Sequence, residues 1–461
     1  MMGWQLPMKQ KIIVENPATN EVLETVKNCD SQDVAGEVNH AVEAFRSWSA
    51  IPLIQRRSAL RTIANILDER TDELARILVL EIGKPLVEAR HEVRSAATVF
   101  RTFSDFSIDD AIIRDTEDSL LQEIRRPLGV AALIIPWNYP LLVLSWKLAP
   151  ALLAGNTVVI KPSPYAPLNT MRFSELVKSV IPPGVINIVT GDDATGRSIV
   201  GSKEIAKIAF TGHVDTGRKI LQESGSGLKW ISLELGGNDP AIVLPDFDMK
   251  RLPSLFWSSF RNAGQICIAV KRLYVHDSIF ESVVEKYERM AREVRLGNGM
   301  DEETQMGPVN NPRQLRVVKE LIRDARERGG RVRTGGRKRN GPGYFYPPTV
   351  VTDVDENCRL VSEEQFGPVI PIMPYSHIDE AIDRANSLRY GLGASVWTSN
   401  VTEGRKVAEQ IQSGTVWVNT HMIVDPLASF GGVKDSGLGK ELGIRGYDEY
   451  CSVRTININR K

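Results

Sequence analysis

Apolar and charged positions alternate at helical spacing through the first hundred residues. Apolar residues recur every three or four positions in segments 33–48, 54–82 and 87–103, with charged residues between them. This is the pattern of amphipathic helices, each of which buries one face. We therefore expect three helices that together cover another layer of the structure.

The second hundred residues contain short apolar runs without alternation. Residues 130–135 read VAALII and end at Pro136, as expected of a strand that is buried on both faces. Similar runs at 157–160, 185–189 and 205–210 are each followed by a helical stretch. Strands alternating with helices predict a parallel sheet of right-handed βαβ units, which binds ligands beyond the carboxyl ends of its strands.

A second series of strand and helix patterns extends from Pro240 to Trp397 and predicts a second α/β domain. Its strands are expected at residues 241–244, 272–275 and 369–372. The two series meet at residues 234–237, where adjacent glycines suit a tight crossing between domains. The tail, residues 452–459, alternates apolar and polar positions, which predicts a strand with one covered face.

Composition narrows the class of protein. A chain of 461 residues predicts two or three domains, and 42% apolar with 25% charged residues is typical of soluble globular proteins. The 57 basic and 57 acidic residues balance, so no net field favours nucleic acid or an anionic membrane, and a small or neutral partner is favoured. The most apolar stretch, 141–153, contains Lys147 and is too short to span a bilayer. Residues 1–11 lack the apolar core of a secretory signal.

The cysteines predict neither a metal site nor a disulfide framework, because they are scattered and form no C-x-x-C pair. The cytoplasm is the default compartment for such a chain. The four are Cys29, Cys267, Cys358 and Cys451. By itself, Cys267 is more typical of a small buried apolar residue than of a nucleophile. However, Gly264 and Gln265 before it suggest a bend that exposes a side chain, and a cofactor's positive ring nearby would lower the thiol pKa.

Two polar residues directly follow predicted strands of the first sheet. Asn138, in PWNYP, either belongs to a rigid turn or donates its side-chain amide to a developing oxyanion without adding a charge. Lys161 ends the second strand, where this type of sheet meets an adenosine ribose, although an exposed lysine is usually only solvated.

Three further turns carry candidate chemistry. Gly212 and Gly217 open a helix at which backbone N–H groups could bind phosphate, although no complete G-x-G-x-x-G is present. Glu234 either accepts backbone hydrogen bonds or, if it faces a cleft beside Cys267, acts as a general base for water. The turn at 363–368 either begins a helix with acidic residues or holds a ribose and a planar ring.

The order of these motifs resembles the aldehyde dehydrogenase superfamily over essentially the whole chain. The matching segments are PWNYP (136–140), WKLAPALLAGN (146–156), KPS (161–163), FTG (210–212), ELGG (234–237), GQIC (264–267), EEQFGPV (363–369) and FGGVKDSGLG (430–439).

The resemblance implies an NAD(P)-dependent oxidoreductase that converts an aldehyde to the carboxylic acid. Cys267 is then the nucleophile, and Asn138 with the Cys267 backbone N–H stabilises the oxyanion. Glu234 activates the water that hydrolyses the thioester, and Lys147 has a supporting role in catalysis. The residues implied to bind the cofactor are Ile135, Pro136, Trp137, Asn138, Lys161, Ser163, Phe210, Thr211, Gly212, His213, Glu234, Leu235, Gly236, Glu364 and Phe366.

The resemblance also implies the domain organisation and the assembly. The fold is expected to be α/β, with a Rossmann-like parallel-sheet cofactor domain, a second α/β catalytic domain and a small β oligomerisation extension. Residues 1–107 and 124–235 are assigned to the NAD(P)-binding domain and 236–434 to the catalytic domain. Residues 108–123 and 435–461 are assigned to oligomerisation of a homodimer or homotetramer.

Two departures from the family pattern concern the cofactor. Family members strict for NAD commonly have a glutamate after Lys-Pro-Ser, whose charge repels a 2′-phosphate, but this chain has Pro164. We therefore expect use of both NAD and NADP. His213 replaces a serine that is common in relatives; it either contacts phosphate or packs, and packing is favoured.

The substrate prediction depends on two positions that point to different aldehydes. Arg261 resembles the arginine with which succinic semialdehyde dehydrogenases bind the far carboxylate. Trp146 stands where those enzymes supply a second arginine, which favours a neutral aliphatic or aromatic aldehyde. The residues expected to shape the pocket are Trp146, Trp257, Arg261, Ile266, Ile268 and His421.

Two rival functions follow from the same fold. A binding protein without turnover is disfavoured because Cys267, Asn138 and Glu234 are all present. A CoA-acylating enzyme would also form the thioester, but Glu234 at the position of the base favours water as the acceptor.

Overall fold

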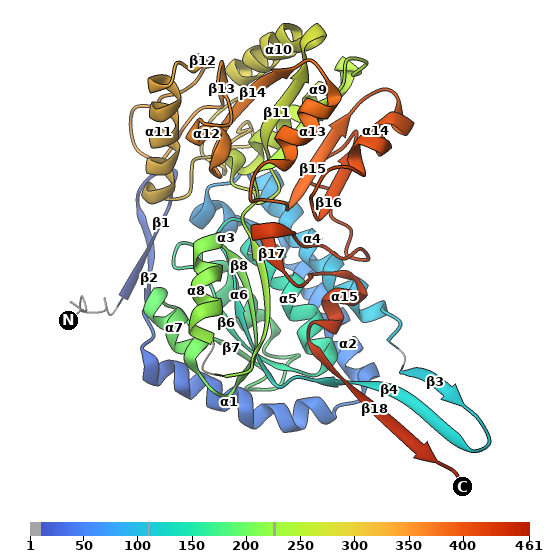
Figure 1. The fold of residues 1–461 in the computed structure, drawn as a ribbon. Helices are drawn as coiled ribbons and strands as arrows, with labels where there is room; N and C mark the ends of the chain where they lie inside the picture. Colours follow the sequence, from blue (N-terminus) through green and yellow to red (C-terminus); the bar gives the residue numbers. More distant parts are fainter. Residues whose placement is uncertain (1–10, 109, 225–226) are drawn as a thin grey trace, which may run out of the picture.

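The computed structural model describes residues 11–108, 110–224 and 227–461. Residues 1–10, most of the segment for which no secretory signal is predicted, lie outside the described residues. Figure 1 shows two α/β units, one above the other, and a smaller sheet that projects from the lower unit. The α/β fold expected from the sequence is therefore confirmed.

The lower unit contains a six-stranded sheet in the order β17-β9-β8-β5-β6-β7. Five strands are parallel, and β17 lies antiparallel beside β9. All four strands predicted in this unit are present, and β9 and β17 are additional. The strands are β5 (Val130–Ile134), β6 (Thr157–Lys161), β7 (Ile186–Ile188), β8 (Ile205–Gly212), β9 (Trp230–Leu235) and β17 (Gly437–Leu438).

Helices cover both faces of this sheet, which explains why its strands read as continuous apolar runs. Along β5, Ala131 and Leu133 pack into one cluster with the helices α2 to α6, while Val130 and Ala132 pack with α1, α7 and α8. The helices are α1 (Ser31–Ala50), α2 (Leu53–Glu69), α3 (Thr71–Ile82), α4 (Leu86–Asp105), α5 (Pro140–Ala154), α6 (Leu168–Val177), α7 (Asp193–Gly201) and α8 (Val214–Glu223).

The N-terminal region differs from the prediction in two ways. The single helix expected over 54–82 is wrong, because the chain breaks at Arg70 (φ −103°, ψ 18°) between α2 and α3. The Thr71 hydroxyl bonds the carbonyl oxygens of Leu67 and Asp68 at 3.0 Å, which satisfies the end of α2 through a side chain. A hairpin of β1 (Lys11–Glu15) and β2 (Val22–Lys27), which helical spacing does not predict, precedes α1.

The upper unit contains a seven-stranded sheet in the order β12-β13-β14-β11-β10-β15-β16, parallel except for β12. The second α/β series of the sequence is thus confirmed. Its strands are β10 (Asp239–Val243), β11 (Val270–His276), β12 (Arg331–Thr334), β13 (Thr349–Thr352), β14 (Val369–Tyr375), β15 (Gly393–Trp397) and β16 (Thr415–Val418). Its helices are α9 (Leu252–Phe260), α10 (Phe280–Glu293), α11 (Pro312–Glu327), α12 (Arg359–Ser362), α13 (Ile378–Asn386) and α14 (Val401–Ala408).

A three-stranded antiparallel sheet projects from the lower unit in the order β18-β4-β3 (Figure 1). It consists of β3 (Ala111–Asp115), β4 (Ser119–Pro127) and β18 (Cys451–Asn459), and α15 (Gly443–Asp448) precedes β18. The C-terminal strand predicted at 452–459 is present and pairs with β4 along its whole length. The strand β4 continues to Pro127, past the boundary assigned at residue 123.

The two units meet in a way that places several loops close together. The lower sheet contributes the carboxyl ends of its strands, as the rule for parallel sheets predicts. The upper sheet contributes the segments that precede its strands, namely those before β10, β11 and β14. The candidate site therefore combines strand ends from one sheet with strand beginnings from the other.

Candidate active site

The loop that carries Cys267 is bent by three successive residues with positive φ. Asn262 (φ 48°), Ala263 (φ 53°) and Gly264 (φ 70°) all adopt left-handed backbone conformations. A β-carbon on Gly264 would lie 2.2 Å from the carbonyl oxygen of Gly367, so this position has room only for glycine. The bend predicted before Cys267 is thus present, and the Cys267 side chain is partly buried rather than sealed in the core.

Asn138 reaches this loop from the turn between β5 and α5. Its side-chain Nδ2 donates to the carbonyl oxygen of Gln265 at 2.9 Å, and its own carbonyl accepts from Lys84 Nζ at 2.8 Å. Lys84 is in turn paired with Glu92 at 2.5 Å, with both side chains fully buried. An amide nitrogen carries two N–H groups, so Asn138 keeps one for a further acceptor near Cys267.

The backbone N–H of Cys267 has no hydrogen-bond partner within the described ranges. Its free donor and the second amide N–H of Asn138 are the two groups that an oxyanion would need.

Glu234 lies near the end of β9, between Thr211 of β8 and Gly437 of β17. Both carboxyl oxygens are buried, and neither has a hydrogen-bond partner among the described residues. Burial raises the pKa of Glu234 to about 8, while the charge of Lys147 and the thiol of Cys267 act against the rise. Once ionised, an unbonded carboxylate beside a thiol is suited to take a proton from water, and its raised pKa makes it a stronger base than an ordinary carboxylate.

Lys147 is fully buried in α5 and forms an ion pair with Glu441 from the C-terminal segment. Because both groups shift the pKa of Glu234, the pair lies within electrostatic reach of that carboxyl. The supporting position predicted for Lys147 therefore comes with a partner 294 residues away in sequence.

The Cys267 thiol holds its proton firmly in the protein alone. Burial is the largest cause and raises its pKa well above the ordinary range, and Glu234 adds to the rise. Lys271 acts in the opposite direction. The lowered pKa expected beside a cofactor's positive ring would therefore have to overcome the effect of burial.

The segment containing Glu364 and Phe366 lies over the crossing between the two units. Glu364 Oε1 accepts from the backbone N–H of Gly237 at 3.2 Å. A β-carbon on Gly236 would lie 2.1 Å from Glu364 Oε2, which gives the adjacent glycines a specific reason. The ring of Phe366 packs edge-on against Trp137, with centroids 5.4 Å apart. These residues, widely separated in sequence, are brought together as predicted for one face of a cofactor site.

The other predicted cofactor residues lie at the ends of β6 and β8. Lys161 is buried, its ammonium bonds the carbonyl oxygen of Gly191 at 2.7 Å, and burial lowers its pKa to about 8. The Thr211 hydroxyl is buried without a partner among the described residues, so it is free for a ligand. A β-carbon on Gly212 would meet the Phe210 ring at 2.5 Å. The remaining predicted residues lie at the ends of neighbouring strands: Ile135 and Pro136 follow β5, Ser163 follows β6, and Leu235 ends β9 with Gly236 after it.

The packing predicted for His213 is wrong. Its side chain is 61% exposed and caps α8, where Nδ1 accepts from the backbone N–H of Asp215 at 3.2 Å. The imidazole of His213 thus caps the N-terminus of α8, the same helix end at which the alternative prediction placed a phosphate.

Three of the predicted pocket residues lie together, and a fourth lies elsewhere. Trp146, Ile266 and Ile268 belong to one apolar cluster that Cys267, Tyr139 and Met422 contact, and Trp146 packs against Phe430 at 5.2 Å. Trp257 packs instead into the cluster around α9 and α10.

His421 and Arg261 take places that the pocket prediction does not anticipate. His421 is sealed behind the loop, where Nε2 lies 2.7 Å from the carbonyl oxygen of Ile268, and burial lowers its pKa to about 3. It therefore supports the loop instead of lining open space. The side chain of Arg261 is exposed, within electrostatic reach of Glu88 and Tyr139.

Several site residues have no place in the sequence prediction. The sequence could have indicated Lys271, because Lys271 and Arg272 are adjacent cations near the start of a strand that is otherwise apolar. Glu441 carries no local signal, because its partner Lys147 is 294 residues away. The pair of Lys84 with Glu92 is connected to the site only through the bond from Lys84 to the backbone carbonyl of Asn138. Asp239 is fully buried on β10, and burial raises its pKa to about 7.

Comparison with known proteins identifies the family to which the chain belongs. The Aldehyde dehydrogenase family model matches residues 4–456. The chain is 38% identical over 462 residues to phenylacetaldehyde dehydrogenase from Pseudomonas fluorescens, covering 96% of this chain and 92% of that protein. It is 35% identical over 455 residues to a succinate-semialdehyde dehydrogenase (NADP+) from Escherichia coli (strain K12), covering 97% and 94%.

Solved structures show the same relationship. Betaine aldehyde dehydrogenase from Staphylococcus aureus, crystallised with NAD+, superposes with a TM-score of 0.95 at 33% identity, over 98% of this chain and 92% of that one. A mutant of an aldehyde dehydrogenase from Bacillus cereus superposes with a TM-score of 0.96 at 37% identity, over 98% and 94%. The chain belongs to the aldehyde dehydrogenase family and is an NAD(P)-dependent oxidoreductase acting on aldehydes.

The described residues contain neither a candidate membrane-spanning helix nor a candidate metal site. No helix within 11–108, 110–224 and 227–461 is long and apolar enough to cross a membrane. Over those same ranges, no group of three or more His, Cys, Asp or Glu side chains is arranged to hold a metal ion.

Proposed function

We propose that the enzyme oxidises a neutral aliphatic or aromatic aldehyde to its acid, with Cys267 as the nucleophile and Glu234 as the base for hydrolysis. The observation that carries the proposal is the convergence of three groups from separate elements. Asn138 bonds the nucleophile loop, and the unbonded carboxyl of Glu234 lies near enough to Cys267 for each group to shift the other's pKa.

The first step forms a bond between Cys267 Sγ and the aldehyde carbon, after the thiol proton has passed to water. The carbonyl oxygen takes up the electron pair and accepts hydrogen bonds from Asn138 Nδ2 and the Cys267 N–H, whose remaining donors are free. A bound nicotinamide cofactor supplies a hydride acceptor for that carbon. The carbon remains on Cys267 as a thioester, with the C=O bond restored.

The second step releases the acid. Glu234 takes a proton from water, the water oxygen attacks the thioester carbon, and the C–S bond breaks. The positive charge of Lys147 favours the ionised form of Glu234, while the charge of its partner Glu441 acts in the opposite direction.

The test is NAD(P)H formation from a panel of aldehydes, with and without CoA. We expect turnover without CoA, loss of all NAD(P)H formation in Cys267→Ala, and retention of one equivalent per site in Glu234→Gln. Turnover that requires CoA would support the CoA-acylating alternative instead, and full activity of Cys267→Ala would overturn the proposal.

The cofactor is proposed to be NAD or NADP, with Lys161 at the adenosine ribose and Glu364 at the nicotinamide half. The residues fit such a group: a buried ammonium whose partners are carbonyl oxygens, a buried Thr211 hydroxyl without one, and Gly212 closely packed on Phe210. Pro164 brings no charge against a 2′-phosphate. Steady-state rates with each cofactor test this, and Pro164→Glu should impair NADP alone. A strong preference of the unmodified enzyme for NAD would contradict dual use.

A carboxylated semialdehyde is the second candidate substrate, favoured by Arg261 and by the succinate-semialdehyde dehydrogenase among the relatives. The neutral aldehyde is preferred because Trp146, packed edge-on against Phe430, makes the wall apolar where a second cation would be needed. Rates with succinic semialdehyde and benzaldehyde, each for wild type and Arg261→Ala, separate the two. Only the carboxylated substrate should lose rate in Arg261→Ala if Arg261 binds it.

We also propose that the three-stranded sheet mediates a homodimer or homotetramer. Its outer strands expose Ile112, Ile113, Val453 and Ile458 by 42–64%, and β3 and β18 are both unpaired edges. Light scattering of wild type and of Ile113→Lys/Val453→Lys measures the assembly, and an unchanged mass in the variant would count against this surface.

All four cysteines are free thiols, which supports a reducing compartment such as the cytoplasm.

A further inference from the structure

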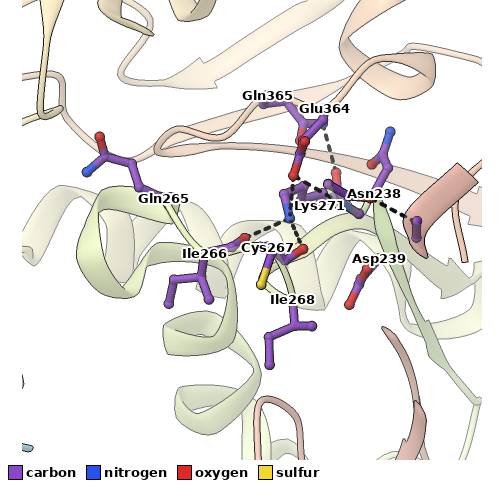
Figure 2. A network of polar contacts seen from close by, with 12 residues as sticks. Asn238, Asp239, Gln265, Ile266, Cys267, Ile268, Lys271, Glu364 and Gln365 are labelled. Atoms are coloured by element: carbon purple, nitrogen blue, oxygen red, sulfur yellow. Dashed lines mark hydrogen bonds and ion pairs between the residues drawn. The ribbon is translucent and has the colours of Figure 1, made fainter. Parts of the chain in front are cut away.

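The backbone of the nucleophile loop is held through its carbonyl oxygens. Lys271 Nζ, from the start of β11, donates to the carbonyl oxygens of Ile266 at 2.8 Å and of Cys267 at 2.6 Å. Figure 2 shows this ammonium beside the backbone of the cysteine, with dashed lines to both carbonyls, while the sulfur points away from it. The Ile266 carbonyl and the Cys267 N–H belong to the same planar peptide group. Because Lys271 holds this carbonyl and the next one, the orientation of the Cys267 N–H is fixed as well.

The same ammonium contacts the segment proposed to hold the nicotinamide half. It lies 3.5 Å from Glu364 Oε1 and 6.0 Å from the centre of the Phe366 ring. The side chains of Lys271 and Glu364 are only 3% and 9% exposed, so the pair is weakly screened by solvent. Lys271 therefore joins the nucleophile loop to a segment about a hundred residues further along the chain (Figure 2).

The electrostatic surroundings of the thiol are otherwise negative. Glu234 on β9, Asp239 on β10 and Glu364 before β14 each raise the pKa of Cys267, and burial raises it most. Of the groups that act most on this thiol, Lys271 is the one that favours the thiolate. Tyr139, from the turn before α5, lies within electrostatic reach of the same thiol.

We propose that Lys271 is the positioning residue that makes Cys267 reactive, because its ammonium fixes the loop through two carbonyls and places a positive charge at the backbone of the nucleophile. The ion pair with Glu364 partly neutralises the charge of Lys271. The proposal deepens the proposed function, on whose assignment of Cys267 as nucleophile it rests. A positively charged neighbour is the usual means of stabilising a thiolate.

The test measures the thiol itself and needs neither cofactor nor aldehyde. Iodoacetamide alkylation of the full-length protein is followed from about pH 6 into the alkaline range, because burial raises the pKa of Cys267 above that of an ordinary thiol. Peptide mass spectrometry separates Cys267 from the other three cysteines. We expect Lys271→Met to move the midpoint of the alkylation curve to higher pH. Below the midpoint, alkylation should slow about tenfold for each pH unit by which the midpoint rises.

Two further variants give the prediction a sign and a baseline. Glu364→Gln should move the midpoint to lower pH, since it removes a negative charge near the thiol and frees the ammonium of its partner. Lys229→Met is the matched control: that lysine also bonds two backbone carbonyls, those of Ser202 and Ile205, at the opposite end of the lower sheet. Its midpoint should equal that of wild type.

The outcomes distinguish a charge effect from a purely structural one. If Lys271→Met loses turnover but alkylates with the wild-type midpoint, the residue only supports the fold and the proposal is overturned. If Lys271→Met does not fold, a midpoint for Glu364→Gln that is unchanged or higher overturns it equally. Failure of the proposed function looks different: Cys267→Ala would then oxidise aldehydes while the midpoint changes of the lysine and glutamate variants persist.

Discussion

Replacing Glu234 by glutamine tests the division of labour between attack and hydrolysis. The amide has nearly the same shape as the carboxyl group but cannot take a proton from water. Neither carboxyl oxygen bonds another described residue, so the change removes a base without breaking a structural contact. We expect the thioester to form and then to persist, because only its hydrolysis needs Glu234.

The size of the effect follows from the pKa of about 8 that burial gives Glu234. At pH 7 roughly a tenth of the carboxyl groups are ionised, and at pH 9 roughly nine-tenths, from the titration of a single group. General base catalysis contributes about 10²- to 10⁴-fold to a rate. The ratio of wild-type to Glu234→Gln turnover should therefore be about tenfold larger at about pH 9 than at about pH 7.

The assay is stopped-flow measurement of NAD(P)H absorbance over that pH range. Glu234→Gln should give a burst of one equivalent per active site, followed by slow turnover, and the slow phase should lack the alkaline rise of wild type. Loss of the burst would show that Glu234 acts before hydride transfer. A wild-type to variant ratio that does not change with pH would refute the raised pKa as the cause.

Three other changes probe the surroundings of the site. Gly264→Ala places a β-carbon 2.2 Å from Gly367 O and should lower kcat roughly 100-fold by displacing the loop; Gly36→Ala, with open space around it, is the control, and equal activities would contradict the clash. Lys147→Met leaves Glu441 buried without its partner, which should cost about 3–5 kcal/mol of unfolding free energy in urea and move the alkaline rise in turnover to higher pH; an unchanged unfolding midpoint would count against the pair. Asp239 binds a proton more tightly in the folded state, where its pKa is about 7, than in the unfolded chain, so its contribution to stability falls as pH rises toward that value. Asp239→Asn should therefore raise the melting temperature more at about pH 8 than at about pH 5, and an equal gain at both would refute the sign.

The sequence by itself determined the α/β class, the two series of strands and helices, and the nucleophile motif. Those features depend on local causes: short uninterrupted apolar runs such as residues 130–134 are typical of strands buried on both faces, and Gly264 is needed for one turn. The break at Arg70 was missed because apolar spacing continues across it, while the backbone there turns through side-chain bonds from Thr71.

Tertiary structure alone decided which charges surround the thiol. The distance from Lys147 to Glu441 along the chain is 294 residues, and Glu364 meets Lys271 only because β11 and β14 are neighbouring strands. No local pattern encodes such pairs, since each depends on how the two sheets face one another. His421 shows the same limit, because no local pattern predicts the hydrogen bond between its ring and the carbonyl oxygen of Ile268. Burial, which only the packed chain creates, then raised the pKa of Cys267 and Glu234, the two groups on which the chemistry is proposed to depend.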